Sequence, residues 1–453
     1  MYNDAVRLIR LIINYGYDAY LVGGCVRDMV MNLVPHDYDI TTNAQPNDII
    51  RIVKKAGLRY YDAGIKYGTV NVQIGDNMYE VTTYRGESGY RDSRRPSNVT
   101  FINTLDKDLS RRDFTINAMA YDVINNRIID PFGGMQDIRN GVIRAVGDPN
   151  VRFSEDALRI LRAMRFSIKL KFSIDKETLY TMNDNAAGLK NISRERVTQE
   201  LEKILTCGNG IRQVFTVCNR IISMLFPEIT PCIGFNQNSY YHIHNVYEHC
   251  LYVVDGCKSN KFEIKLAALF HDIGKPKSYF VGKDGYGHFH GHPNVSYDIC
   301  KEMFKKRLAL SKKQYDHVLE LIKYHDATVV PDEAVVKRFL NKHSEEVFRD
   351  FLVLKQADLD DHINLIGDDK KYCLEMWKVE AVLNKVLSEN HAIGIRDLAI
   401  NGSDIMRITN TPAGKHIGII LNQLLEEVID NKIVNNRSIL ENRVREISSL
   451  GNR

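Results

Sequence analysis

The spacing of apolar residues changes about one third of the way along the chain. Up to about residue 146, short β-type runs alternate with helical stretches and turn signals, the runs being residues 19–22, 38–42, 69–74 and 79–84. After Asp148 and Pro149, apolar residues recur at three- and four-residue spacing, as through residues 157–166 and 197–205. The pattern predicts an α/β domain over residues 1–146, followed by all-α structure.

The helical remainder divides at residues 227–239, a loop-like stretch with Pro, Gly and Asn. We therefore expect a helical domain over 147–226, a histidine-rich domain over 240–361 and a further helical region over 362–453. Several domains also follow from the length, because 453 residues exceed what one hydrophobic core usually serves.

Composition narrows the class of protein. Hydrophobic residues at 44% and charged residues at 26% are ordinary for a water-soluble globular chain, and a net charge of +4 is compatible with an RNA partner. The 8 cysteines include no Cys-x-x-Cys pair, which argues against zinc fingers and suits a reducing compartment. Without a signal-peptide pattern or a membrane-spanning apolar run, we expect a cytoplasmic protein with no membrane partner. No obligatory protein partner is indicated.

Two glycines stand where the first predicted strand ends and a helix begins. Gly23 and Gly24 would let backbone N–H groups approach a phosphate, and Arg27, one turn later, could hold that phosphate. Most such pairs merely form a tight turn. Their neighbours make the functional interpretation the better one.

Three acidic residues lie on the strands predicted next to this turn. Asp37 and Asp39 are two positions apart on a predicted strand, so both carboxylates project from one face. Such a pair could hold two Mg²⁺ ions, which would activate a 3′-hydroxyl and neutralise a leaving pyrophosphate. Glu80, on a later strand, is the candidate third carboxylate; the alternative for all three is a solvated strand edge.

These features resemble the DNA polymerase β nucleotidyltransferase superfamily. The run Leu-Ser-Arg-Arg-Asp-Phe-Thr-Ile-Asn-Ala-Met-Ala at 109–120, with Asp-Pro-Phe-Gly-Gly at 130–134, resembles the bacterial class II tRNA nucleotidyltransferases, the CCA-adding enzymes, and their poly(A) polymerase relatives. The resemblance extends to about residue 205, through Glu155-Asp156-x-x-Arg159 and Arg196-x-x-x-Glu200. It implies a polymerase-β-like head and template-independent addition of CCA to tRNA from CTP and ATP.

The same resemblance implies roles for single residues. Asp37 and Asp39 would bind Mg²⁺, and the incoming CTP or ATP would be contacted by Gly24, Arg27, Arg112, Asp156, Arg159, Arg162 and Arg165. The last four recur every third residue of a predicted helix and would share one broad face, although a basic helix face is usually only solvated. An acceptor beside donors complements the amine and ring nitrogen that cytosine and adenine share.

Residues 85–96 are polar and contain glycine, so we expect a mobile loop there instead of core. In the family, a flexible loop at this place resembles a lever that reshapes the pocket from C to A, and enzymes that add only CC look truncated here. The retained loop favours a final A addition. An ordinary surface loop is the alternative.

The histidine-rich region has the residue order of HD phosphohydrolases. The matching residues are His249, His271, Asp272 and Asp358, with His292 and His325 as further candidate ligands. Imidazole and carboxylate together suit a divalent transition metal, a second metal beside Mg²⁺. The resemblance implies phosphomonoesterase or cyclic phosphodiesterase activity that could trim damaged 3′ ends, although such domains can be catalytically silent. His242 and His244, taken singly, are expected to be structural.

Three alternatives stay open. A poly(A) polymerase or an A-only tRNA nucleotidyltransferase shares the same Asp and Arg motifs. The protein could instead be chiefly an HD metal-dependent phosphohydrolase whose head only binds, which the intact Asp37 and Asp39 argue against. A noncatalytic RNA-binding module would tolerate Asp37→Ala.

Overall fold

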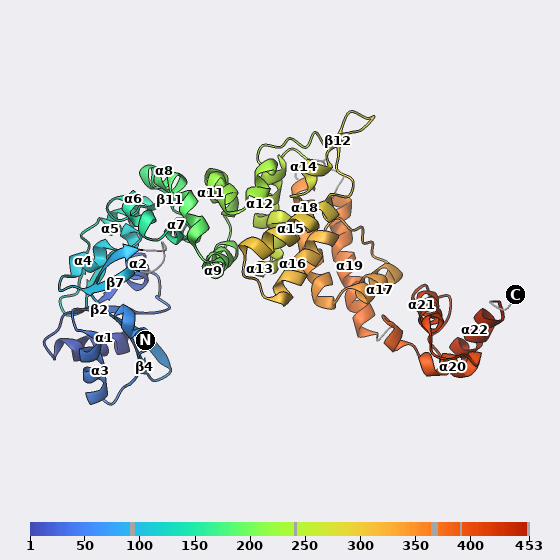
Figure 1. Ribbon diagram of the computed structural model, residues 1–453, viewed down its shortest axis with the longest axis horizontal. Coiled ribbons are helices and arrows are strands. Elements are labelled where there is room, and N and C mark those ends of the chain that lie inside the picture. The colour runs from blue at the N-terminus through green and yellow to red at the C-terminus, as the bar shows by residue number, and fades with distance from the viewer. Residues whose placement is uncertain (91–95, 240–241, 364–369, 390–391, 451–453) are drawn as a thin grey trace. The chain divides into compact units, whose positions relative to one another are not determined.

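The computed structural model describes residues 1–90, 96–239, 242–363, 370–389 and 392–450 (Figure 1). The chain forms two compact units, Met1–Thr230 with Lys305–Ala309, and Pro231–Phe304 with Leu310–Arg453. The four-domain division expected from the sequence is finer than this and stays a prediction.

A mixed β-sheet forms the centre of the N-terminal unit. Its strand order is β3-β4-β5-β2-β1-β8-β9, and β2 and β5 are its parallel pair. The strands are β1 (Ala19–Val22), β2 (Asp39–Thr42), β3 (Arg59–Tyr61), β4 (Thr69–Ile74), β5 (Asn77–Thr83), β8 (Ala120–Asp122) and β9 (Arg127–Ile129). The four β-type runs correspond to β1, β2, β4 and β5, which confirms those predictions.

Helices cover this sheet because their apolar positions fall on one side. In α1 (Tyr2–Ile13), Ala5, Leu8, Ile9 and Ile12 have the spacing of one helix face, and all four are fully buried. They share a core with residues of the sheet and of α2 (Gly24–Val30), α3 (Pro46–Lys55) and α5 (Gly134–Asn140). The predicted α/β character of this part is therefore confirmed.

The loop predicted over residues 85–96 is wrong for its described part. Strands β6 (Arg85–Tyr90) and β7 (Pro96–Phe101) pair antiparallel, with Arg85 opposite Phe101. Ladder hydrogen bonds join backbone groups, so a polar composition does not prevent strand pairing. Residues 91–95, at the centre of the predicted loop, lie outside the described residues.

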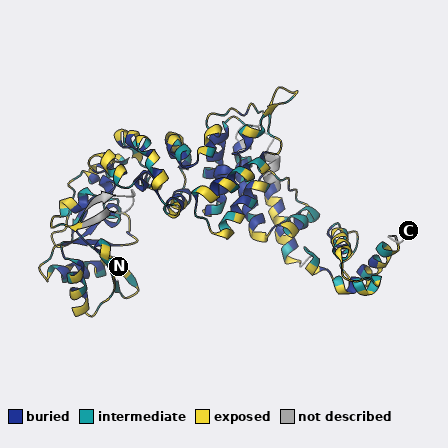
Figure 2. Cartoon of the chain, viewed as in Figure 1, coloured by how far each residue is buried: buried dark blue, intermediate teal, exposed yellow. Residues whose placement is uncertain are grey.

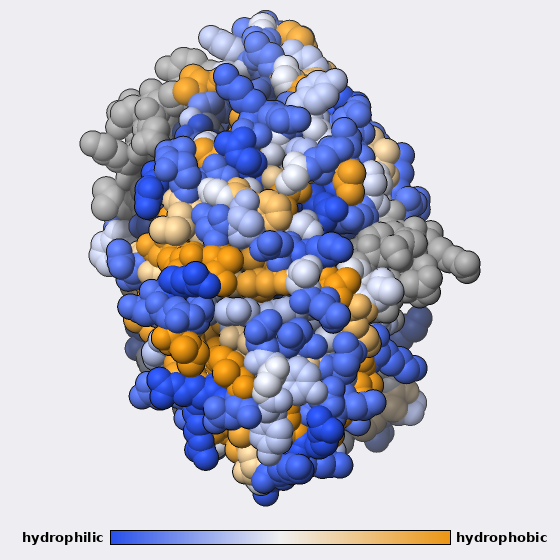
Figure 3. All heavy atoms as spheres, turned by 90° about the vertical axis from the view of Figure 1, so that its left-hand side faces the viewer, coloured by the Kyte–Doolittle hydropathy of each residue, from blue (hydrophilic) through white to orange (hydrophobic). Residues whose placement is uncertain are grey.

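The rest of the N-terminal unit is mainly helical, as predicted. Asp148 caps α6 (Pro149–Glu155) by accepting a hydrogen bond from the Asn150 amide at 2.9 Å, and Pro149 occupies the first turn of that helix. The helices are α4 (Leu105–Ser110), α6 (Pro149–Glu155), α7 (Leu158–Leu170), α8 (Lys176–Asp184), α9 (Arg194–Thr206), α10 (Ile211–Val217) and α11 (Asn219–Leu225). Seen from the side of this unit, the surface is mostly hydrophilic with short apolar bands (Figure 3).

The C-terminal unit is built from helices, with α13 at its centre. Apart from half-buried Glu263, every residue of α13 is buried, as the dark blue segment in Figure 2 shows. The helices are α12 (Val246–Gly256), α13 (Phe262–Phe270), α14 (Lys275–Ser278), α15 (His292–Arg307), α16 (Lys312–Tyr324), α17 (Glu333–Lys342), α18 (Glu345–Ile363), α19 (Lys370–Ser388), α20 (Gly402–Thr409), α21 (Lys415–Ile429) and α22 (Arg437–Leu450). Among the described residues, no helix has the length and apolar character needed to span a bilayer.

Candidate functional site

The glycine turn brings the end of β1 next to the first aspartate of β2. Gly23 has φ +81°, a left-handed conformation that glycine adopts without strain. A Cβ atom at Gly23 would lie 3.0 Å from Arg112 Nη1 and 3.9 Å from Asp39 Oδ2. The turn, a guanidinium and a carboxylate therefore meet at one place.

Asp39 is the first residue of β2 and lies opposite Val22. Asp37 precedes the strand, so the prediction that both lie on it is wrong for Asp37; β1 ends at Val22 and offers no partner further on. The predicted alternation of core-facing and outward-facing side chains nevertheless holds. Tyr38 and Ile40 are buried in the core, while Asp37 is exposed and Asp39 is half-buried.

Glu80 reaches the same place through the parallel pairing of β5 with β2, in which Val81 lies opposite Ile40. Burial, together with the negative charges of Glu80 and Asp37, raises the pKa of Asp39 to about 6, against the opposing charge of Arg112. Asp39 and its two acidic neighbours form an oxygen donor set that fits Mg²⁺.

Two arginines flank the turn in different ways. Arg27 is nearly fully buried, and its Nη1 donates to Asn117 Oδ1 at 2.8 Å while Nε and Nη2 donate to Asp28. Arg112 lies against Gly23 and forms an ion pair of 3.5 Å with Asp108. Asn117 and Asp108, which hold these arginines, were not singled out from the sequence.

Asp156 does not lie on a helix, so the prediction of four residues on one helix face is wrong for it. Helix α6 ends at Glu155, and Asp156 is extended, with φ −146°. Its Oδ1 accepts a hydrogen bond from the Leu158 amide at 3.1 Å, which caps the start of α7. Nη1 and Nη2 of Arg196, from α9, donate to its two oxygens at 3.2 and 2.7 Å.

The arginines of α7 also have carboxylate partners. Nε and Nη2 of Arg162 donate to Asp113 Oδ2 at 2.8 and 2.6 Å. Burial opposes the charge on Asp113, but Arg162 and a hydrogen bond from Asn117 lower its pKa to about 2. A hydrogen bond from Arg165 Nε to Glu200 joins α7 to α9.

Arg159 and one aromatic ring complete this part of the site. Arg159 donates to Glu155 Oε2 at 2.7 Å and to the Arg111 carbonyl at 2.9 Å, which links α7 to the segment before Arg112. The Phe166 ring lies 4.4 to 5.5 Å below the guanidinium carbons of Arg165, Arg27 and Arg162. Within the N-terminal unit, the arginines predicted from the sequence are thus brought together.

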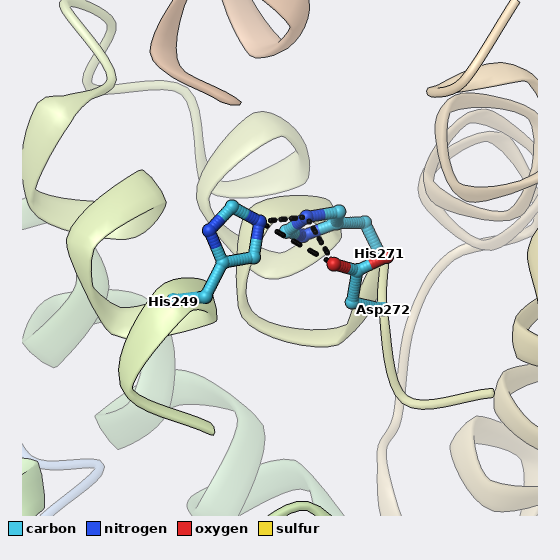
Figure 4. Close-up of side chains that lie close together, drawn as sticks. All are labelled: His249, His271 and Asp272. Atoms are coloured by element: carbon cyan, nitrogen blue, oxygen red, sulfur yellow. Dashed lines mark hydrogen bonds and ion pairs between the residues drawn. The ribbon is translucent and has the colours of Figure 1, made fainter. Parts of the chain in front are cut away.

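In the C-terminal unit, the four predicted HD residues converge although they come from α12, the end of α13 and α18. His249 Nε2 lies 3.2 Å from His271 Nε2, 3.3 Å from Asp272 Oδ2 and 3.2 Å from Asp358 Oδ1. Figure 4 shows the first three side chains pointing toward one another. Converging imidazole nitrogens and carboxylate oxygens are the ligand set of a divalent transition metal.

A second group shares Asp272 with the first. His292 Nε2 lies 3.1 Å from Asp272 Oδ1 and 3.1 Å from His325 Nε2, and His325 Nε2 lies 3.5 Å from Asp272 Oδ1. The two oxygens of Asp272 therefore face different histidine pairs. This arrangement could hold one or two metal ions.

The outer nitrogens fix the ring orientations. Nδ1 of His271, His292 and His325 donates to the carbonyl oxygens of Ala268, Phe289 and Ile322 at 2.7 to 2.9 Å. Each Nε2 is thereby left as an acceptor, as metal ligation requires. His249 Nδ1 lies 2.8 Å from Asp361 Oδ2, an outer partner not predicted from the sequence.

Asp272 carries the clearest sign of a cation site. Within the described residues neither of its buried oxygens has a hydrogen bond of suitable geometry. Lys275 Nζ lies 2.7 Å from Oδ2, and this buried ammonium also donates to Gln237 Oε1 at 2.9 Å. Carboxylate oxygens that lie close to several nitrogen atoms, but accept no hydrogen bond of suitable geometry, fit a metal ion.

Four family models match the chain. They are the poly A polymerase head domain over residues 19–144, the probable RNA and SrmB-binding site of polymerase A over 171–232, the HD domain over 239–346 and a putative tRNA nucleotidyltransferase domain 2 over 301–444. The chain thus combines a match to the head domain of poly(A) polymerases with a match to an HD domain. The predicted fold class, a nucleotidyltransferase head followed by all-α domains including an HD domain, is confirmed.

Named relatives agree with these matches. The chain is 46% identical to a CCA-adding enzyme of Lactobacillus helveticus over 213 residues, 47% of this chain and 52% of the relative. It is 48% identical to one of Geobacillus sp. over 45% of this chain and 49% of the relative. The chain thus spans about half the length of the curated relatives it matches.

Solved structures match over nearly the whole chain. The Bacillus stearothermophilus CCA-adding enzyme in complex with CTP is 27% identical, with a TM-score of 0.68 over 100% of this chain and 98% of that one. The Thermotoga maritima CCA-adding enzyme complexed with tRNA_CCA is 21% identical, with a TM-score of 0.61 over 98% and 95%, and supports the fold.

Proposed function

We propose that this protein adds CCA to the 3′ end of tRNA without a template, using CTP and ATP. The observation that carries the proposal is the meeting of Asp39, flanked by Asp37 and Glu80, with the glycine turn of a poly(A) polymerase head. Relatives and structures named as CCA-adding enzymes support this choice over the other members of the family.

Asp37 and Asp39 are the proposed Mg²⁺ ligands, with Glu80 as the third carboxylate. When bound, Mg²⁺ would neutralise the triphosphate and help the 3′-hydroxyl to attack. Because Gly23 has no side chain, the Arg112 guanidinium and Asp39 can both lie close to the backbone of the turn, where a phosphate is proposed to bind. Arg112 offers the nearest guanidinium, and Arg27 of α2 is proposed to contact the nucleotide as well.

The base is proposed to be selected by Asp156 and Arg159, with Arg162 and Arg165 beside them. Ion pairs with Arg196 and Asp113 hold Asp156 and Arg162 in place before any nucleotide binds. A site that is ordered in advance rejects a wrong base more strongly, because its donors and acceptors cannot move to fit a mismatched base. Gly24 completes the proposed nucleotide-binding set.

The 3′ ends made from tRNA lacking CCA test this function. With all four nucleoside triphosphates present, we expect sequenced products to end in CCA and to stop there. A single added A would indicate an A-only enzyme, and long A tails a poly(A) polymerase. Unextended tRNA would contradict every nucleotidyltransferase proposal.

Substitution of the aspartates separates catalysis from RNA binding. Asp39→Ala is expected to lower incorporation at least about a hundredfold while tRNA affinity stays within a few fold, because a metal ligand serves the transition state. Asp76→Asn, in an exposed turn of the same sheet, is the matched control and should stay active. Retained incorporation by Asp39→Ala would show that Asp39 is not a required metal ligand, and no incorporation by the unsubstituted chain would favour an RNA-binding module.

A second activity is favoured by the geometry around Asp272. We propose that this cluster binds a divalent transition metal through His249, His271, Asp272 and Asp358, and hydrolyses 2′,3′-cyclic phosphates or phosphomonoesters at RNA 3′ ends. The oxygens of Asp272, which have no hydrogen bond of suitable geometry within the described residues and face two histidine pairs, support the metal. The cytoplasm is the proposed location, which the free thiols of the described cysteines suit.

A further inference from the structure

A pocket of about 540 Å³ opens over the metal cluster of the C-terminal unit. At one end it is lined by the candidate ligands Asp272, His292, His325 and Asp358. At the other end it is lined by Asp284, Tyr286 and residues 287–291, which belong to the hairpin formed by β12 (Phe280–Val281) and β13 (Gly287–His288) or follow it directly. Phe280 packs against two of these lining residues, His288 and His290. A molecule that fills the pocket would lie next to both ends.

Three rings on this hairpin form an exposed aromatic group. The ring centroids of Phe280 and His288 lie 5.5 Å apart, those of His288 and His290 5.7 Å apart, and those of Phe280 and His290 5.3 Å apart. His288 and His290 are nearly parallel, at 24°. Phe280 is 45% exposed and packs against both imidazole rings.

The hairpin is fixed relative to the metal cluster. Gly287 donates its amide to the Asn238 carbonyl at 2.8 Å, and a Cβ atom at Gly287 would lie 2.3 Å from the Gln237 carbonyl oxygen. The side chain of Gln237 in turn accepts a hydrogen bond from Lys275, the partner of Asp272. Backbone contacts therefore set the distance between the rings and Asp272.

The two ends of the pocket differ in chemistry. The metal cluster and the ammonium groups of Lys275 and Lys355, which lie 2.7 Å from Asp272 and 3.7 Å from Asp358, attract a phosphate. The rings at the other end offer π faces, on which unpaired bases stack regardless of sequence. A phosphate joined to a base is the ligand that satisfies both ends.

We propose that the β12–β13 hairpin stacks the terminal base of an RNA 3′ end or a nucleotide, and so presents its 2′,3′-cyclic phosphate or terminal phosphate to the metal cluster. This rests on the proposed hydrolytic function and names its substrate class: nucleotides, in preference to phosphoesters without a base. In the cyclic case, a water oxygen bonds to phosphorus, one ribose oxygen leaves, and that oxygen takes the proton.

Kinetics with and without a base test the proposal. The metal-loaded chain is compared with Phe280→Ala and His290→Ala, using 2′,3′-cyclic AMP and glycerol 1,2-cyclic phosphate. Each substitution is expected to raise KM for cyclic AMP about tenfold, since stacking on one side chain contributes this much, and to leave the base-free substrate unchanged. Equal KM values in all three proteins would overturn the proposal.

Two further variants separate stacking from other roles. Val281→Ala, on the same strand and also exposed, carries no ring and should behave as the unsubstituted chain. His290→Phe keeps a ring without a ligand atom, so its KM should stay within about twofold of the unsubstituted value. A loss of bound metal in His290→Phe would show instead that His290 is a ligand.

Equilibrium binding distinguishes a failed hairpin from a failed hydrolase. Adenosine 3′-phosphate is titrated into the full chain and into Phe280→Ala, and glycerol 2-phosphate serves as the base-free comparison. If no substrate is hydrolysed but Phe280→Ala weakens nucleotide binding about tenfold, the hydrolytic function fails and the stacking surface stands. If binding is unchanged, the stacking surface is wrong whatever the turnover.

Discussion

The environment of each carboxylate decides its role in the N-terminal unit. Asp39 has acidic neighbours and a pKa raised to about 6 by burial and their charges, so it gains from a cation. Asp113 is more deeply buried, yet Arg162 and Asn117 lower its pKa to about 2. The same residue type is therefore a candidate metal ligand at one place and a structural anchor at the other.

The Asp113–Arg162 pair should make the N-terminal unit sensitive to acid. A carboxyl whose pKa is lower in the folded state stabilises that state above the unfolded pKa, near 4, and loses this contribution as pH falls toward 2. We expect Asp113→Asn to lower the free energy of unfolding by about 2 kcal/mol at pH 7, a loss that shrinks by about half at pH 3.

Hydrogen exchange of the N-terminal unit measures this difference, because the one tryptophan of the chain, Trp377, lies in the other unit. Asp184→Asn, at the end of α8, provides the comparison for a substitution away from the pair. A difference between Asp113→Asn and the unsubstituted chain that stays constant from pH 7 to pH 3 would show that the charge of Asp113 does not contribute.

At the level of elements, the sequence pattern predicts the helices and strands that are long enough to show a regular spacing of apolar residues. Apolar periodicity predicts α9 because it buries one face along its whole length, and it predicts α7 because its apolar residues recur at helical spacing although more than one side is buried. It does not predict β3, β8 and β9, because three residues contain too few alternations to reveal a period.

Contacts between residues that are far apart in the sequence are also not predicted. Arg196 binds Asp156 from 40 positions away, and Arg162 binds Asp113 from 49. The motifs identify the residues at the two candidate sites. The ion pairs that orient them depend on how α9 packs against α7 and on how α7 packs against the segment that contains Asp113. The break between α6 and α7 is likewise not predicted, since it involves the hydrogen bond that Asp156 accepts from the Leu158 amide.

The contact between α14 and α15 should control the metal cluster. A Cβ atom at Gly274 would lie 2.6 Å from the Ser296 amide nitrogen and 2.7 Å from the His292 carbonyl oxygen, both backbone atoms of α15. Gly274→Ala must therefore push α15 and its ligand His292 away from Asp272. We expect metal affinity to fall about 10- to 100-fold, measured as metal retained after dialysis.

Gly418 supplies the control for that substitution. It lies within α21, and a Cβ atom there would meet nothing within 4 Å. Gly418→Ala should keep the metal and slightly stabilise its helix. Full metal retention by Gly274→Ala would mean that His292 does not contribute to the site.

At the scale of the whole molecule, each unit contains one complete candidate site. The carboxylates, glycine turn and arginines all belong to the N-terminal unit, and the HD histidines and aspartates all belong to the C-terminal unit. If the two activities act in succession on one RNA end, hydrolysis must come first, because nucleotide addition requires a free 3′-hydroxyl. Opening of the cyclic phosphate frees that hydroxyl when the 3′ oxygen leaves, or after the resulting 3′-phosphomonoester is hydrolysed in turn.

This order predicts how two variants act on tRNA that ends in a 2′,3′-cyclic phosphate. His271→Ala with Asp272→Asn should abolish extension of the cyclic end but leave extension of a free 3′-hydroxyl within about twofold, because it removes metal ligands of one unit only. Asp39→Ala should do the reverse, leaving the 3′-hydroxyl freed and the RNA unextended. End-group analysis with both substrates decides between them. Loss of both activities in either variant would mean that the sites depend on each other, and extension of cyclic ends by the HD variant would mean that the metal cluster does not prepare them.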